Sequence, residues 1–196
     1  MKKIYIVLTH TGTVLSRIIK MYTKDEFSHV SISLDEELKQ MYSFGRLNPY
    51  NPLIGGFVHE YIDKGTFKRF FKTNAGVYSL EVTNEQYQGI RNSINDFEQN
   101  KEKYKFNIIG LFAAGFHKKI SCKHSFYCAE FVKYVMEQAG IETKLPEAVK
   151  PEDFKKIENL EKVYSGLLRK YNISKRKDNI KLQMEDMLIN NKGAKI

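Results

Sequence analysis

The chain has 196 residues, of which 42% are hydrophobic and 13% aromatic, and this is enough to bury the core of one domain. No apolar run reaches the ~18 residues of a membrane span, so no transmembrane segment is expected. The formal net charge of +9 favours an anionic partner, such as an acidic substrate or a peripheral anionic surface. Nucleic acid is an unlikely partner, since no recognised binding module accompanies the charge.

Cysteine usage and the N-terminal segment bear on the cellular compartment. With only two cysteines, Cys122 and Cys128, a disulfide scaffold is not expected. The apolar opening at 4–8 is too short for a secretion signal followed by a cleavage site, and it is typical of a strand. We therefore expect a cytoplasmic protein.

The first half of the chain predicts mainly strands. In chain order we expect a buried strand at 4–9, a short helix at 14–21, a hairpin of strands at 28–35 and 40–45, and a loop at 49–56. A strand or an irregular segment follows at 57–61, and then a strand at 76–82. Within the hairpin, polar and apolar residues alternate strictly, with Val30 and Ile32 on one face and His29 and Ser31 on the other.

The second half predicts mainly helices. We expect a helix from Thr83 to about Glu102, a buried helix at 108–116, a helix around Cys128 that ends at Gly140, a helical turn from Pro151 and a strand or helix at 160–170. This order favours an α+β fold with a mainly antiparallel sheet. We divide the chain into a domain at 1–171 and a basic C-terminal extension at 172–196.

Cys128 is the strongest candidate for a reactive group. Ser125 is a plausible N-cap, which would place Cys128 in the first turn of its helix. Unpaired backbone N–H groups and the helix dipole favour a thiolate there, and a thiolate is a nucleophile. The alternative is a packing role, because Phe131 and Val132 continue an apolar stripe on the same side of the helix.

His29 is the candidate base for this thiol. A strand holds a catalytic side chain more rigidly than a loop, and an imidazole can take the proton from a thiol that attacks a carbonyl. The other four histidines fit less well: His10, His59 and His117 fall in turns or loops, and His124 is too near Cys128 in sequence. Cys122, His124 and Cys128 match no standard zinc spacing, so neither a metal nor a cofactor is expected.

Two segments together resemble a known family. They are Ser28-His29-Val30-Ser31-Ile32 and, much later, Phe126-Tyr127-Cys128-Ala129-Glu130-Phe131-Val132. In this order they resemble the circularly permuted, YiiX-like branch of the NlpC-type papain-like cysteine hydrolases, in which the histidine strand precedes the cysteine helix. The resemblance covers about residues 4–170. It implies a papain-like antiparallel sheet packed against helices, with Cys128 as nucleophile and His29 as base.

The same family places a third polar residue on the strand after the histidine strand. Ser43 is the nearest match here, although it departs from the charged pattern; Glu60 is the alternative from the next segment, and Tyr42 fits if the register slips by one. An oxyanion hole is expected from the backbone N–H of Cys128. Its second donor is Tyr127, Thr9, His10 or Thr11.

The sequence thus predicts a cysteine-dependent hydrolase or acyltransferase. It would act on an amide or ester of a small peptide, a peptidoglycan fragment or a lipid-linked substrate through a thioacyl intermediate. The glycine-containing segments 45–49 and 55–57 either border a substrate groove or form turns. The competing hypothesis is a catalytically weak or inactive module of the same fold that binds acidic or lipid surfaces.

Overall fold

The computed structural model describes residues 1–13, 17, 25–116, 118–120 and 123–174. The predicted helix at 14–21 falls almost wholly outside these residues, as does nearly all of the predicted basic extension. No helix in the described ranges has the length and apolar character needed to cross a membrane.

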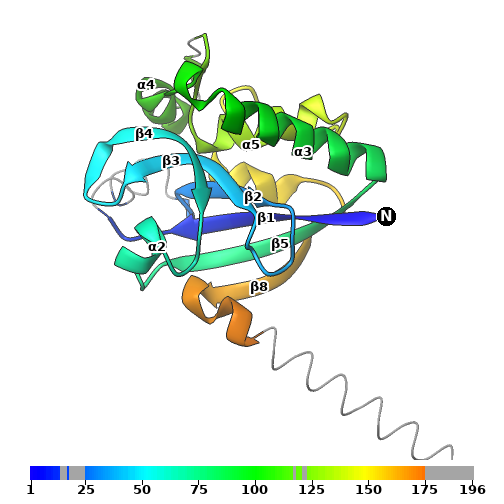
Figure 1. The fold of residues 1–196 in the computed structure, drawn as a ribbon, viewed down its shortest axis with the longest axis horizontal. Coiled ribbons are helices and arrows are strands. Elements are labelled where there is room, and N and C mark those ends of the chain that lie inside the picture. Colours follow the sequence, from blue (N-terminus) through cyan, green and yellow to red (C-terminus); the bar gives the residue numbers. More distant parts are fainter. Residues whose placement is uncertain (14–16, 18–24, 117, 121–122, 175–196) are drawn as a thin grey trace, which may run out of the picture.

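Six strands form one sheet at the centre of the molecule (Figure 1). In chain order they are β1 (Lys2–His10), β2 (His29–Ser33), β3 (Met41–Asn48), β4 (Asn51–Glu60), β5 (Asn74–Val82) and β8 (Glu161–Leu167). Their spatial order is β4-β3-β2-β1-β5-β8, and every neighbouring pair is antiparallel. With the helices packed on this sheet, the predicted α+β antiparallel fold class is confirmed.

Helices cover the sheet on both sides. The described helices are α2 (Gly65–Arg69), α3 (Asn84–Gln99), α4 (Ile108–Gly115) and α5 (Cys128–Gln138), with short 3₁₀ turns η1 (Lys101–Lys103), η2 (Pro151–Lys156) and η3 (Leu168–Lys170). Figure 1 shows α3 and α5 along one face and α2 on the other. A small parallel pair, β6 (Lys105–Phe106) and β7 (Ser125–Phe126), joins the segments that lead into α4 and α5.

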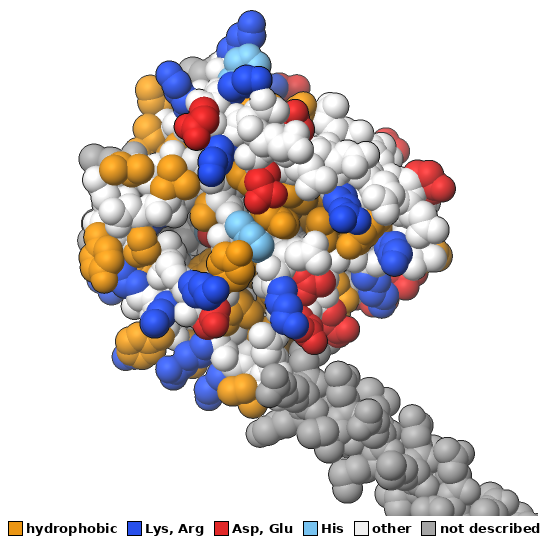
Figure 2. Space-filling view, in the orientation of Figure 1, with side chains coloured by type: hydrophobic (Ala, Val, Ile, Leu, Met, Phe, Trp, Pro, Cys, Tyr) orange, Lys and Arg blue, Asp and Glu red, His pale blue; other side chains and the backbone are white. Residues whose placement is uncertain are grey.

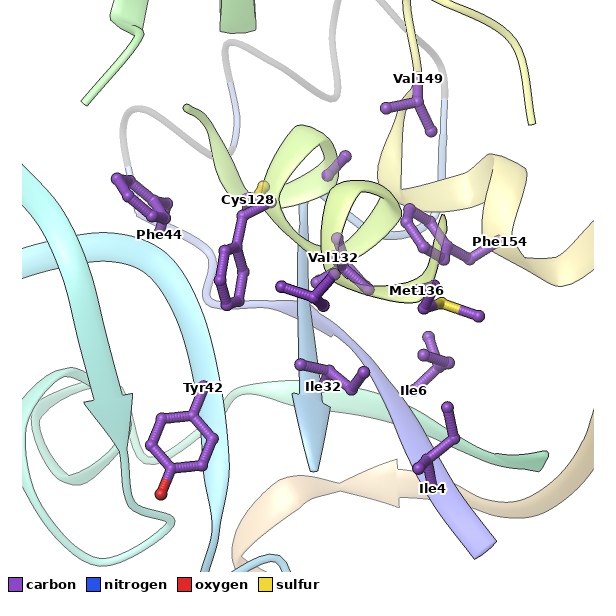
Figure 3. Packing of buried hydrophobic residues seen from close by; sticks show 14 of the residues in the cluster. Ile4, Ile6, Ile32, Tyr42, Phe44, Cys128, Val132, Met136, Val149 and Phe154 are labelled. Carbon is purple, nitrogen blue, oxygen red and sulfur yellow. The ribbon is translucent and has the colours of Figure 1, made fainter. Parts of the chain in front are cut away.

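The apolar run in β1 is explained by burial on both faces of the sheet. Ile4 and Ile6 pack in the core beneath α3 and α5, whereas Tyr5 and Val7 belong to a second cluster on the opposite face. Figure 3 shows Val132 of α5 above the strands of the first cluster. Continuous burial, rather than alternation, is what such a central strand requires.

A cluster of aromatic rings stabilises the region where α3, α5 and the β3–β4 hairpin meet. Phe97 of α3 is 1% exposed and lies at its centre. Its ring contacts six others, namely Phe44, Phe57, Tyr104, Phe126, Phe131 and Tyr134. Most of these pairs are edge-on or tilted, which is the favoured geometry for aromatic rings.

Two predictions about local structure are wrong. The predicted loop at 49–56 is mostly strand, because β4 begins at Asn51 and only a tight turn separates it from β3. The predicted buried helix at 108–116 is α4, but Ile109 and Phe116 are 63% and 59% exposed. One side of α4 covers the core while the other faces solvent. Because the sequence of this helix is apolar on all sides, it does not indicate which side is buried.

The start of α3 and the C-terminal end of α5 follow the predicted signals. Thr83 caps α3: its hydroxyl accepts the backbone N–H of Gln86, whose side chain accepts the Thr83 N–H in return. Gly140 follows α5 with a φ of +76°, a left-handed conformation that favours glycine. At the C-terminal end, 160–170 contains a strand followed by the η3 turn.

Candidate active site

Cys128 is the first residue of α5, directly after the N-cap Tyr127. The predicted cap at Ser125 is wrong, because Ser125 belongs to β7. The carboxylate of Glu130 accepts the backbone N–H of Tyr127 at 3.3 Å, and this fixes the start of the helix. No acceptor engages the backbone N–H of Cys128 within the described part of the chain, so this donor remains available at the helix tip.

His29 opens β2 at a point where the sheet splays apart. Main-chain pairing between β2 and β3 is limited to Ile32 with Tyr42 and Ser33 with Met41. The first half of β2 therefore has no β3 partner, and the carbonyl of Val30 instead accepts the Ser43 hydroxyl at 2.7 Å. This separation lies at the end of β2 that carries His29.

Glu60, at the end of β4, binds the imidazole of His29. His29 Nε2 lies 3.0 Å and 3.3 Å from the two carboxylate oxygens, and the Ser31 hydroxyl donates to one of them at 2.5 Å. Since Nε2 is held by Glu60, the other ring nitrogen, Nδ1, is left for a different partner. The structure thus brings the predicted alternative, Glu60, to His29, and it places Ser43 in a main-chain contact instead.

The charge state of His29 follows from its surroundings. Burial alone lowers the pKa of His29, but the negative charge of Glu60 and hydrogen bonds to Cys128 and Glu60 outweigh it and raise the pKa to about 10. The imidazole is therefore protonated at neutral pH.

A cleft opens where Cys128, His29 and Glu60 meet. Its walls come from the ends of several strands, from α2 and from the start of α4, and they include Thr11, Thr13, Ser28, Phe44, Gly45, Arg46, Gly55, Thr66, Phe67, Phe106 and Leu111. It holds about 70 Å³ of space for water, which is room for several water molecules or a small chemical group. Cys128 itself is 3% exposed, and it lines this cleft.

Two glycines shape the cleft wall formed by the β3–β4 hairpin. A Cβ on Gly55 would lie 2.7 Å from the Phe106 ring, so only glycine lets the two segments approach this closely. A Cβ on Gly45 would lie 3.4 Å from both His29 and Glu60. Of the two sequence interpretations of these segments, the structure supports the groove border.

The predicted oxyanion and substrate residues Tyr127 and Thr9 are both buried. The Tyr127 hydroxyl donates to the Val149 carbonyl at 2.9 Å, and the Tyr127 backbone N–H is taken by Glu130. Thr9 lies opposite His29 on β1 but is fully buried, and its hydroxyl oxygen has no hydrogen-bond partner in the described structure. Of the four predicted second donors, Thr11 lines the cleft.

The remaining histidines with a described environment have other contacts. His59 stacks between Tyr42 and Tyr61, and its ring nitrogens contact the Lys39 carbonyl and the Tyr61 hydroxyl. Cys122 and His117 lie outside the described residues. Within the described ranges, no three His, Cys, Asp or Glu side chains are grouped so that they could hold a metal ion.

Sequence reasoning could name Glu60 but not rank it first. The pairing of Met41 with Glu60 places this carboxylate on the same side of the sheet as Ser31 and His29. That register depends on the tight turn after Asn48. The glycines and prolines of this segment predicted a long loop at 49–56 instead of a tight turn. Arg46 also lines the cleft, and its sequence signal is a cation between Gly45 and Leu47 within a strand.

Comparison with known proteins supports the fold and does not assign a family. No family model matches the chain, and no curated protein matches it in sequence. A matching solved structure is that of the metalloprotein YiiX from Escherichia coli O157:H7, DUF1105, with a TM-score of 0.51 and 15% sequence identity. The match covers 84% of this chain and 97% of that one. At this identity the likeness concerns the fold alone.

Proposed function

We propose that the protein is a cysteine-dependent hydrolase or acyltransferase of the permuted papain-like type, acting on an amide or ester bond. The observation that carries the proposal is that His29, whose ring binds Glu60, lines the same cleft as Cys128. A nucleophile, a base and a group that orients the base are the three parts that thiol-based acyl transfer requires.

In this mechanism the Cys128 thiolate attacks the carbonyl carbon of the substrate, and the carbonyl oxygen becomes an oxyanion. The free backbone N–H of Cys128 donates to that oxyanion. The His29 imidazolium then protonates the leaving amine or alcohol, the carbon–nitrogen or carbon–oxygen bond breaks, and a thioester remains on Cys128. Water or an amine then attacks the thioester while neutral His29 removes its proton; the acyl group leaves as the acid or the amide, and Cys128 is released as the thiolate beside the imidazolium.

Glu60 acts by holding the imidazole. Its bond to Nε2 fixes the ring orientation and leaves Nδ1 free of Glu60, and its charge stabilises the imidazolium. Ser31 in turn fixes the Glu60 carboxylate.

The proposal is tested by trapping the thioester. The protein is mixed with p-nitrophenyl esters of short acyl chains and of N-acylated amino acids, and the intact mass is measured at early times. We expect an acyl adduct on Cys128 that is absent from Cys128→Ala and strongly reduced in His29→Ala. Acylation of His29→Ala at the wild-type rate would refute the catalytic role of the histidine.

A second candidate function is docking to an anionic lipid surface. Helix α4 exposes Ile109, Phe112 and Phe116, and the exposed Lys118 follows it directly. Figure 2 shows apolar side chains gathered on the side where α4 and β4 lie. Apolar residues next to cations are typical of interfacial binding. Co-sedimentation with phosphatidylserine vesicles that is lost in Phe116→Ser would favour this function.

A further inference from the structure

We propose that Arg46 forms an anion-binding subsite within the Cys128 cleft, so that the preferred substrate carries a carboxylate or phosphate group next to its reacting carbonyl. The inference deepens the proposed function and rests on it for the identity of the reacting thiol. Arg46 has no part in the proposed acyl-transfer mechanism.

Arg46 lacks the partner that a half-buried guanidinium normally has. Within the described residues no carboxylate lies within ion-pair distance of it, and its hydrogen-bond partner is the neutral Thr13 hydroxyl, 2.8 Å from Nη2. Glu60, the carboxylate that lines the same cleft, is already engaged by His29 and Ser31. A half-buried cation without a counter-charge loses part of its hydration, and a bound anion compensates for that loss.

A second cation lies beside the first. The guanidinium groups of Arg46 and Arg69 stack on the same ring, at 5.7 Å and 5.5 Å from the centre of Phe70. Arg69 also lies 3.8 Å from the centre of the Tyr50 ring and, like Arg46, has no ion pair in the described structure. Burial and the charge of Arg69 both lower the pKa of Arg46. Two like charges held together by aromatic packing create a local positive potential that attracts an anion.

The position of Arg46 connects this potential to the reacting thiol. It follows Gly45 on β3, and Gly45 faces His29 and Glu60. Arg46 and Cys128 line one continuous cleft, together with the hydroxyl-bearing residues Thr11, Thr13 and Thr66. A guanidinium offers several donors in a planar fork, which suits the paired oxygens of a carboxylate or phosphate. On the surface, Figure 2 shows basic side chains interspersed with apolar ones where α2 lies.

Two alkylating reagents of nearly equal size test the subsite. Iodoacetate is anionic and iodoacetamide is neutral, and each transfers its carbon to a thiolate sulfur with release of iodide. Their rates at Cys128 are measured by mass spectrometry of the digested protein, with Cys122 as an internal reference. We expect Arg46→Gln to lower the ratio of the iodoacetate rate to the iodoacetamide rate about tenfold.

The matched control is Arg91→Gln, which removes the same charge from an exposed position on α3. It separates a local subsite from the general effect of the net charge on an anionic reagent, because only the local effect depends on position. An equal ratio in wild type, Arg46→Gln and Arg91→Gln would overturn the proposal.

A binding measurement distinguishes the anion and does not depend on thiol chemistry. Glutarate and methyl phosphate are titrated calorimetrically into wild type and Arg46→Gln. Weaker binding of glutarate alone in the variant assigns a carboxylate, and weaker binding of methyl phosphate alone assigns a phosphate. If Cys128 resists both alkylating reagents but the variant still binds an anion less tightly, the subsite stands and the proposed function fails. Identical titrations of the two proteins would overturn the subsite.

Discussion

Replacing Glu60 by glutamine isolates the effect of its charge on His29. The amide has nearly the shape of the carboxylate and keeps one oxygen near the ring, but it carries no charge. A pKa raised from 6.5 to about 10 corresponds to about 5 kcal/mol in favour of the protonated ring. Among the groups that raise this pKa, Glu60 makes the largest contribution. A hydrogen bond to a charged group is worth about 1.5–3 kcal/mol, which is about 10–100-fold in a rate that depends on imidazolium and thiolate together.

We therefore expect Glu60→Gln to lower the pKa of His29 well below 10 and to slow alkylation of Cys128 by iodoacetamide about 10–100-fold near neutral pH. The ring pKa is measured by NMR titration and the rate by mass spectrometry. Ser43→Ala is the control, because Ser43 bonds to the Val30 carbonyl rather than to His29. An unchanged His29 pKa in Glu60→Gln, or an equal loss of rate in Ser43→Ala, would refute the role given to Glu60.

Three further predictions concern stability. Folding raises the pKa of His29 above its ordinary 6.5, so the protonated ring stabilises the folded protein. The unfolding free energy of wild type should therefore exceed that of His29→Gln by the largest amount below pH 6.5, and this difference should shrink toward pH 10. A difference that grows with pH would contradict the raised pKa. Gly55→Ala should lower the unfolding free energy by about 1–3 kcal/mol, since the new methyl group meets the Phe106 ring at 2.7 Å, and a neutral effect in urea denaturation would show that the ring moves freely. Phe97→Ala should cost about 3–5 kcal/mol by the same measurement, and a loss below 1 kcal/mol would argue against its central place in the aromatic cluster.

Local signals predicted the elements that local physics determines. The alternation in β2 placed His29 on the opposite face from Val30 and Ile32, and the capping pattern at Thr83 located the start of α3. Gly140 marked the end of α5 because its left-handed conformation is a property of that single position.

Tertiary contacts decided what local signals could not. The start of α5 lies at Tyr127 rather than Ser125, because β7 pairs with β6 across about twenty residues of chain and keeps Ser125 extended. Glu60 reaches His29 only through the register of β3 against β4, and Arg46 enters the cleft only because β2 and β3 separate. Such long-range pairing leaves no periodic trace in the sequence.

The account depends most directly on whether the Cys128 sulfur is activated by His29. The decisive measurement is the iodoacetamide alkylation rate of Cys128 relative to Cys122 in wild type and in His29→Ala. Faster labelling of Cys128 in wild type, with this advantage lost in His29→Ala, is the predicted result. Equal labelling of the two thiols, with no dependence on His29, would contradict the account and favour a binding module.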